Sequence, residues 1–148
     1  MSDDATVVTH SAEETRAAGE ALARTLHPGD VVALRGELGA GKTCFVQGLA
    51  RGLHASAWAT SPTFVLVNEY RADLPIHHVD AYRTAGPAEL IDIGLVELID
   101  GDGVTVIEWA DRVEPLLPGR TIHVTLEGIG DDPRVITTRR PARSVSDP

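Results

Sequence analysis

The segment at residues 31–43, VVALRGELGAGKT, carries the strongest structural signal in the 148-residue chain. Its first four residues are apolar, which predicts a strand buried on both faces of a sheet. The residues that follow match the pattern G-x-x-x-x-G-K-[ST], whose glycines let backbone N–H groups turn inward around phosphates. We expect Lys42 to reach the β- and γ-phosphates of a nucleotide and the Thr43 hydroxyl to bind Mg²⁺. The order of strand, glycine-rich loop and helix therefore predicts a phosphate-binding loop.

The basic residues of the chain support this interpretation. Lys42 is the only lysine among thirteen basic residues, and the other twelve are arginines. An ammonium is a compact point charge that fits between phosphate oxygens, whereas a guanidinium is planar and wide. The N-K-x-D element by which GTP-specific proteins read guanine cannot be present, because Asn68 is the only asparagine and it is not followed by a lysine. Elimination therefore favours ATP over GTP.

The pattern along the rest of the chain predicts one domain. We expect residues 1–6 to be disordered and Val7-Val8 to form a short strand. Predicted helices cover residues 12–26, 42–53, 87–93, 95–99 and 110–116, and predicted strands cover residues 31–34, 64–70, 76–82, 104–107, 122–126 and 135–138. These elements predict an α/β fold, with a single P-loop NTPase-like domain over residues 1–140. Its sheet should be mixed but mainly parallel and flanked by helices, and residues 141–148 should form a disordered tail.

Composition excludes several classes of function. The formal net charge is −9, so the phosphate backbone of DNA or RNA would repel the isolated chain. No apolar run reaches membrane-spanning length, and the acidic start of the chain does not look like a signal peptide. The single cysteine, Cys44, rules out an internal disulfide and suits a reducing compartment. We therefore expect a cytoplasmic protein without a membrane or DNA partner.

Two acids could complete a nucleotide site. Glu108 ends the predicted strand segment 104–107, and Asp80 ends the segment Ile76–Val79. Acids at the carboxyl ends of buried strands commonly hold Mg²⁺ or orient the attacking water, and the pattern alone does not divide these roles. The segment Ser61-Pro62-Thr63 could sense the γ-phosphate or could simply be a turn. His77 and His78 point to opposite faces of one strand, so they cannot chelate one ion.

Together these residues resemble the TsaE (YjeE) family of bacterial tRNA threonylcarbamoyladenosine biosynthesis ATPases. The resemblance extends from about Ser11 to Arg134. It rests on four pieces in order: the loop at residues 36–43, Ser61-Pro62-Thr63-Phe64 with Glu69-Tyr70, His78-Val79-Asp80-Ala81-Tyr82-Arg83, and Ile107-Glu108-Trp109. The resemblance implies a P-loop α/β fold, slow ATP hydrolysis, and action on a complex of the proteins TsaB and TsaD. Those partners would make the tRNA modification, so contact with tRNA would be indirect.

The resemblance also implies roles for individual residues. Thr43 and Glu108 would bind Mg²⁺, and Asp80 would position the water, so that Lys42, Asp80 and Glu108 form the catalytic set. Residues implied to contact ATP are Thr9, Gly36, Glu37, Leu38, Gly39, Ala40, Gly41, Lys42, Thr43, Cys44, Ser61, Thr63, Asp80 and Arg134. Trp109 would lie beside the site and face the partners. The chain departs from the family pattern at Glu37, where Asp is usual, at Cys44, where Thr is usual, and at Pro133, where Gly usually precedes Arg134.

Two other functions compete with a regulatory ATPase. A small-molecule kinase is also a one-domain P-loop protein, but it usually carries an arginine-bearing lid over the phosphates. Arg83 and Arg112 are isolated in the sequence, which disfavours a kinase. The third hypothesis is a regulator that binds a nucleotide without hydrolysing it. The presence of both Asp80 and Glu108 favours an ATPase over such a regulator.

Overall fold

The computed structural model describes residues 2–37, 39–55, 67–81, 87–92 and 94–141. Its elements in chain order are β1 (Ser2–Thr9), α1 (Ala12–Ala23), β2 (Val31–Arg35), α2 (Lys42–Gly52), β3 (Val67–Tyr70), β4 (Ile76–Asp80), α3 (Pro87–Asp92), α4 (Leu95–Ile99), β5 (Val104–Glu108), the 3₁₀ helix η1 (Ala110–Leu116), β6 (Ile122–Glu127) and β7 (Arg134–Pro141).

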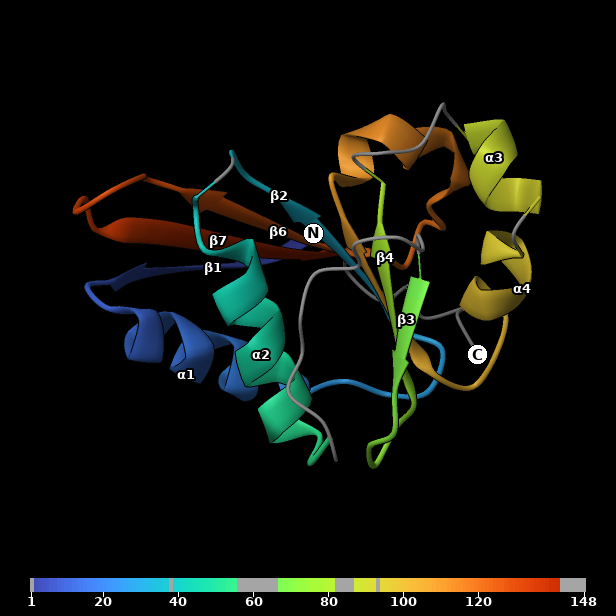
Figure 1. Ribbon diagram of the computed structural model, residues 1–148, viewed down its shortest axis with the longest axis horizontal. Helices are drawn as coiled ribbons and strands as arrows, with labels where there is room; N and C mark the ends of the chain where they lie inside the picture. Colours follow the sequence, from blue (N-terminus) through green and yellow to red (C-terminus); the bar gives the residue numbers. More distant parts are fainter. Residues whose placement is uncertain (1, 38, 56–66, 82–86, 93, 142–148) are drawn as a thin grey trace.

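The strands form one mixed sheet in the order β1-β7-β6-β2-β5-β4-β3. The four central strands β6, β2, β5 and β4 run parallel to one another. Antiparallel pairs lie toward both edges, where β3 joins β4, and where β7 joins β6 and β1. Figure 1 shows α1 and α2 on one side of this sheet and α3 and α4 on the other. The predicted fold class, an α/β domain with a mixed, mainly parallel sheet, is confirmed.

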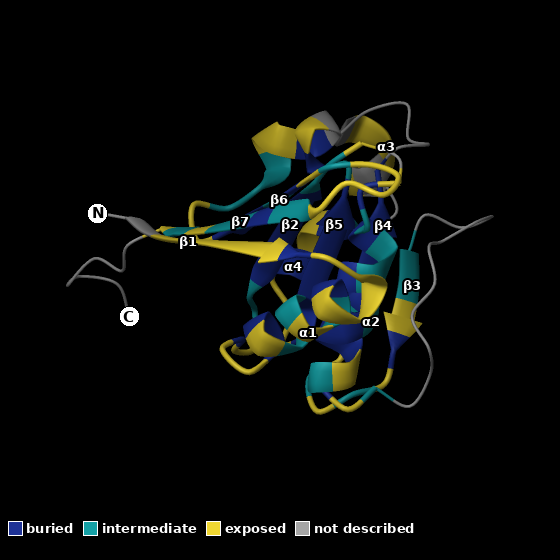
Figure 2. Cartoon of the chain, turned by 90° about the vertical axis from the view of Figure 1, so that its left-hand side faces the viewer, coloured by how far each residue is buried: buried dark blue, intermediate teal, exposed yellow. Residues whose placement is uncertain are grey.

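Strand β2 shows how the sheet divides two hydrophobic cores. Val32 and Leu34 belong to the core under α1 and α2. Val31 and Ala33 belong to the core on the opposite face, which includes residues of α4 and η1. All four side chains are fully buried, and the central strands are dark blue in Figure 2. This continuous burial explains why the segment reads as an unbroken apolar run rather than as alternating residues.

Glycines let α1 and α2 pack with their backbones in close contact. A Cβ on Gly48 of α2 would lie 1.8 Å from the carbonyl oxygen of Arg16 in α1. A Cβ on Gly19 of α1 would lie 2.1 Å from the carbonyl oxygen of Phe45. Because real side chains cannot approach backbone this closely, only glycine fits these two positions. The contact holds the helix that follows the phosphate loop against the start of the chain.

The expectation of disorder at the start of the chain is wrong for residues 2–6. Strand β1 begins at Ser2 and pairs with β7 over its whole length, from Ser2 opposite Pro141 to Thr9 opposite Arg134. Asp4 lies opposite Arg139, and their side chains approach to 3.9 Å. The polar composition of this segment hid the strand, because an edge strand outside the core needs few apolar residues.

The other elements agree with the prediction apart from their ends. Helix α1 ends at Ala23 rather than near residue 26, and β7 extends from Arg134 to Pro141. The first residues of the strand predicted at 64–70, the last of that predicted at 76–82, and most of the tail at 141–148 lie outside the described residues. None of the helices in the described part of the chain is long and apolar enough to cross a membrane.

Candidate functional site

The phosphate loop joins the end of β2 to the start of α2. Gly41 at the helix start and Gly39 before it have φ of +98° and +83°, values that side chains rarely tolerate. A Cβ on Gly36 would lie 2.8 Å from the carbonyl oxygen of Leu126 in β6. The glycines therefore meet two needs, a left-handed turn into α2 and a close approach to β6. Leu38 lies outside the described residues.

Lys42 is the first residue of α2 and is only 6% exposed. Its Nζ donates hydrogen bonds to the carbonyl oxygens of Gly36, at 2.5 Å, and Glu37, at 3.1 Å. Burial lowers the pKa of Lys42 below its usual value, while the carboxylates of Glu108, Asp80 and Asp111 act in the opposite direction. The ammonium is thus held inside the curve of the loop and within the field of three acids.

Asp80 and Glu108 end adjacent parallel strands and lie directly opposite each other in the register of β4 and β5. Both are buried, at 9% and 3% exposure. Because alternate residues of a strand share a face, both side chains lie on the side of the sheet that holds Ile76 and Val106, the core under α2. The tertiary structure therefore brings the two predicted acids together at the edge where the phosphate loop begins.

The donor set is suited to Mg²⁺. Thr43 follows Lys42 in the first turn of α2 and is half-buried, as is Cys44. Magnesium prefers oxygen ligands and is usually bound by one or two protein groups together with phosphates. The described residues contain no group of three or more His, Cys, Asp or Glu side chains that could form a complete metal cage. A hydroxyl at Thr43 and a carboxylate at Glu108 fit an ion that is held partly by a bound nucleotide.

Thr9 and Arg134 lie beside the loop although they are far from it in the sequence. They are cross-strand partners where β1 meets β7. Arg134 donates a hydrogen bond of 3.1 Å to the carbonyl oxygen of Gly39. Thr9 is buried and shares a 2.8 Å hydrogen bond with Thr15, whose methyl carbon lies 3.6 Å from the place a Cβ on Gly41 would occupy. Thr9 and Arg134, which were both predicted to contact the nucleotide, therefore lie next to the loop.

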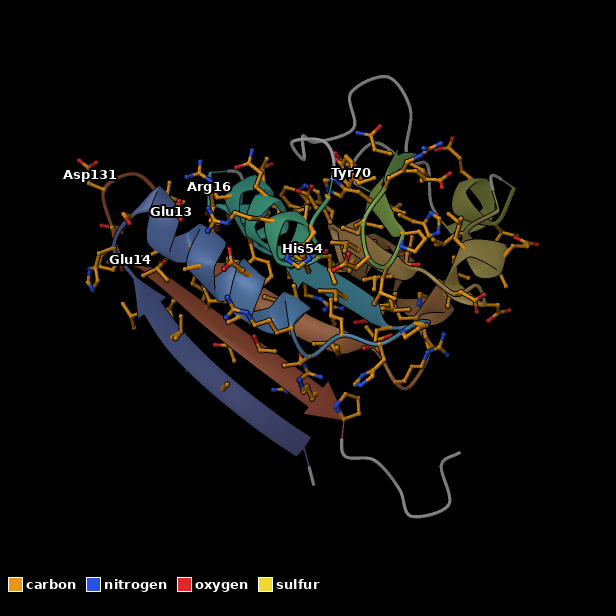
Figure 3. All side chains as sticks on the ribbon, turned by 90° about the horizontal axis from the view of Figure 1, so that it is seen from below. Glu13, Glu14, Arg16, His54, Tyr70 and Asp131 are labelled. Atoms are coloured by element: carbon orange, nitrogen blue, oxygen red, sulfur yellow. The ribbon has the colours of Figure 1, made fainter. Side chains whose placement is uncertain are left out.

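The start of α1 and the turn between β6 and β7 lie at the same end of the molecule as this border. Figure 3 labels Glu13 and Glu14 on α1 and Asp131 in the turn, all at one end of the view. Arg16, one helical turn further along α1, donates a 3.1 Å hydrogen bond to Gln47 of α2. Helix α1 therefore connects the strand that carries Thr9 to the helix that carries Lys42.

Trp109 was expected beside the site from the family resemblance, and two further neighbours were missed by sequence reasoning. The ring of Trp109 lies 4.0 Å from Lys42 Nζ, in cation–π geometry. His78 is fully buried and contacts Glu108, and Thr15 links Thr9 to the loop. A partial signal existed for His78, which lies two residues before Asp80 and therefore on the same face of the strand. No local signal marks Thr15, because its role depends on the packing of α1 against the loop.

Besides Leu38, two more of the predicted nucleotide contacts fall in a segment that the structure does not describe. Ser61 and Thr63 lie outside the described residues, as does the whole segment 56–66. The assignment of this segment to the γ-phosphate remains a prediction.

Comparisons with known proteins relate the chain to one family. A family model described as "Threonylcarbamoyl adenosine biosynthesis protein TsaE" matches residues 9–136. Curated relatives named "tRNA threonylcarbamoyladenosine biosynthesis protein TsaE" include one from Treponema pallidum, 45% identical over 88% of this chain and 96% of the relative. Another, from Bacillus subtilis, is 43% identical over 84% of this chain and 78% of the relative.

A solved structure described as "Crystal structure of Bacillus subtilus YdiB" superposes with a TM-score of 0.79 at 36% sequence identity. The superposition covers 96% of this chain and 88% of the other. The sequence matches and the shared fold lead to one conclusion: the chain belongs to the TsaE family of threonylcarbamoyl adenosine biosynthesis proteins.

Proposed function

We propose that this protein binds Mg²⁺–ATP and hydrolyses it slowly as a subunit of the tRNA threonylcarbamoyladenosine machinery, acting on a complex of TsaB and TsaD. The observation that carries the proposal is the position of Lys42. The only lysine of the chain is buried inside the glycine-rich loop, and the carboxylates of Glu108 and Asp80 act on its charge. Family membership supports the pathway, because the relatives are named for it.

Each residue of the site has a task in this proposal. The backbone N–H groups of the loop and the start of α2 bind the phosphates, and Lys42 exchanges its carbonyl partners for phosphate oxygens. Thr43 and Glu108 hold Mg²⁺, which supplies charge neutralisation at the phosphates when it is bound. Asp80 orients the attacking water. Thr9 and Arg134 border the nucleotide from the other side of the loop.

The acidic charge of the chain fits an indirect role with tRNA. A net charge of −9 opposes direct binding to a phosphate backbone, so the nucleic acid would be held by the partner proteins. Hydrolysis would then act on the partner complex rather than on the tRNA itself.

The decisive assay measures phosphate release from ATP and Mg²⁺ with and without TsaB and TsaD. We expect slow release by the isolated protein and a strong rise when both partners are present. Phosphate transferred to a small metabolite instead would favour the kinase alternative. Equal, slow release in both conditions would contradict the partnership.

Two variants test the assignments of residues. Lys42→Ala and Glu108→Ala should abolish hydrolysis with little loss of fold, because each removes one group at the edge of the sheet. Asp111→Ala serves as the matched control, since Asp111 is an exposed acid that acts on Lys42 only at a distance. Normal turnover in Glu108→Ala would return the metal role to Asp80.

A further inference from the structure

A histidine that the proposed mechanism does not use is buried directly behind Glu108. His78 lies in β4, and its side chain has no exposed surface. Its Nε2 lies 2.5 Å from Oε2 of Glu108 in β5, and its Nδ1 lies 3.0 Å from the hydroxyl of Tyr70 in β3. Three neighbouring strands therefore contribute one connected row of polar groups, from Tyr70 through His78 to Glu108.

The direction of these hydrogen bonds follows from the chemistry of the groups. An ionised carboxylate can only accept, so Nε2 of His78 carries the hydrogen and donates to Glu108. In a neutral imidazole the other nitrogen, Nδ1, is then an acceptor, and the Tyr70 hydroxyl donates to it. Every group in the row has a partner that suits it. The row therefore has one direction, and the Tyr70 hydroxyl holds the imidazole ring at the nitrogen that does not contact the acid.

Within the described part of the chain, Glu108 is held at one of its two carboxylate oxygens. The described residues provide a hydrogen bond to Oε2 from His78 and none to Oε1. A carboxylate whose second oxygen is fixed in this way presents its first oxygen in a defined direction. Hydrogen bonds of this kind orient metal ligands, and their loss typically weakens metal binding by about 10–100-fold.

We infer that His78 is a positioning residue that orients the carboxylate of Glu108 toward the Mg²⁺ of the bound nucleotide, with Tyr70 fixing the orientation of its ring. The inference rests on the proposed function, because it assumes that Glu108 is a metal ligand. The competing explanation is that His78 only fills the core between β3 and β5. Both explanations expect a loss of stability when His78 is changed, so stability cannot separate them.

Two substitutions of His78 can distinguish the positioning role from a purely structural one, because their side-chain amides extend to different distances from the backbone. The amide nitrogen of glutamine can occupy the place of Nε2 and donate to Glu108. The amide of asparagine ends near the place of Nδ1, so it can reach Tyr70 but not Glu108. His78→Gln therefore keeps the hydrogen bond to Glu108, whereas His78→Asn keeps only the hydrogen bond to Tyr70. His77→Asn is the matched control, because His77 is the preceding residue of the same strand and belongs to the opposite face.

The experiment is calorimetry of a non-hydrolysable ATP analogue, with Mg²⁺ and with a chelator in its place. The quantity compared is the factor by which Mg²⁺ tightens binding of the analogue. We expect His78→Asn to reduce this factor by about 10-fold or more, and His78→Gln and His77→Asn to keep it within about 3-fold. Binding measured with the chelator should be the same in all of them, because the loop and α2 are unchanged.

The outcomes separate the inference from the proposal on which it rests. A wild-type protein whose binding does not respond to Mg²⁺ refutes the proposed metal site itself. A normal response in wild type together with an equal response in His78→Asn overturns the inference alone. If His78→Asn does not fold, Tyr70→Phe decides, because it keeps the imidazole but removes the hydroxyl that orients it. A reduced Mg²⁺ response in Tyr70→Phe supports the inference, and an unchanged one refutes it.

Discussion

Replacing Gly48 by alanine would place a methyl group against the backbone of the neighbouring helix. The new Cβ would lie 1.8 Å from the carbonyl oxygen of Arg16, 2.5 Å from its carbonyl carbon and 2.6 Å from its Cα. None of these atoms can move as a flexible side chain would. Restoring an ordinary contact of about 3.5 Å requires α1 and α2 to separate by about 1.7 Å along this line.

The energetic cost follows from that separation. Overpacking a dense interior costs about 1–3 kcal/mol, and a clash with three backbone atoms of Arg16 belongs at the upper end of that range or beyond it. The higher helix propensity of alanine offsets about 1 kcal/mol. We therefore expect Gly48→Ala to lower the free energy of unfolding by about 2 kcal/mol or more, which corresponds to a fall in Tm of about 4–8 °C for a domain of this size.

The assay is urea unfolding followed by circular dichroism, with Gly119→Ala as control. A Cβ on Gly119 meets no atom within 4 Å, and the residue is exposed, so this variant should change stability by less than about 0.5 kcal/mol. Because α2 carries Lys42 and Thr43, Gly48→Ala should also weaken nucleotide binding. A Gly48→Ala protein as stable as the wild type would refute the close packing of α1 against α2.

Three further predictions concern the loop and its neighbours. Amine labelling should modify only Lys42 and the N-terminus, and ATP should protect Lys42. An equal extent of Lys42 labelling with and without ATP would contradict the assignment of Lys42 to the phosphates. Burial lowers the pKa of Lys42, so the unfolded chain holds this proton more tightly and the free energy of unfolding rises with pH in the range just below the ordinary lysine pKa. Wild type should therefore gain stability relative to Lys42→Met as the pH of urea titrations rises toward the ordinary lysine pKa, and a constant difference would show that the ammonium is not desolvated. Arg134→Ala removes the hydrogen bond to the carbonyl oxygen of Gly39 and should weaken nucleotide affinity by about 10-fold in calorimetry; unchanged affinity would exclude Arg134 from the site.

The type and approximate position of most helices and strands could be predicted from the sequence, because they depend on local chemistry. Local effects on the backbone come from the apolar residues at 31–34 and from the glycines at positions 36, 39 and 41, and they extend over only a few neighbouring residues. Strand β1 could not be predicted, because its eight residues are held by pairing with β7 at the other end of the chain. Similarly, the close packing of α1 against α2 is visible in the sequence only as glycines inside two helices, a pattern that by itself indicates weaker helices.

By itself, the sequence determined the glycine-rich pattern that predicts a phosphate-binding loop, the lysine expected to serve it and the two acids available beside it. The physical reason is that a left-handed turn, a helix start and an acid at a strand end are properties of short segments. Only the tertiary structure decided that Asp80 faces Glu108, that Thr9 and Arg134 meet beside the loop, and that His78 is buried behind Glu108. Each of these contacts depends on the order and register of strands that are distant in the chain, and register determines which face a side chain occupies.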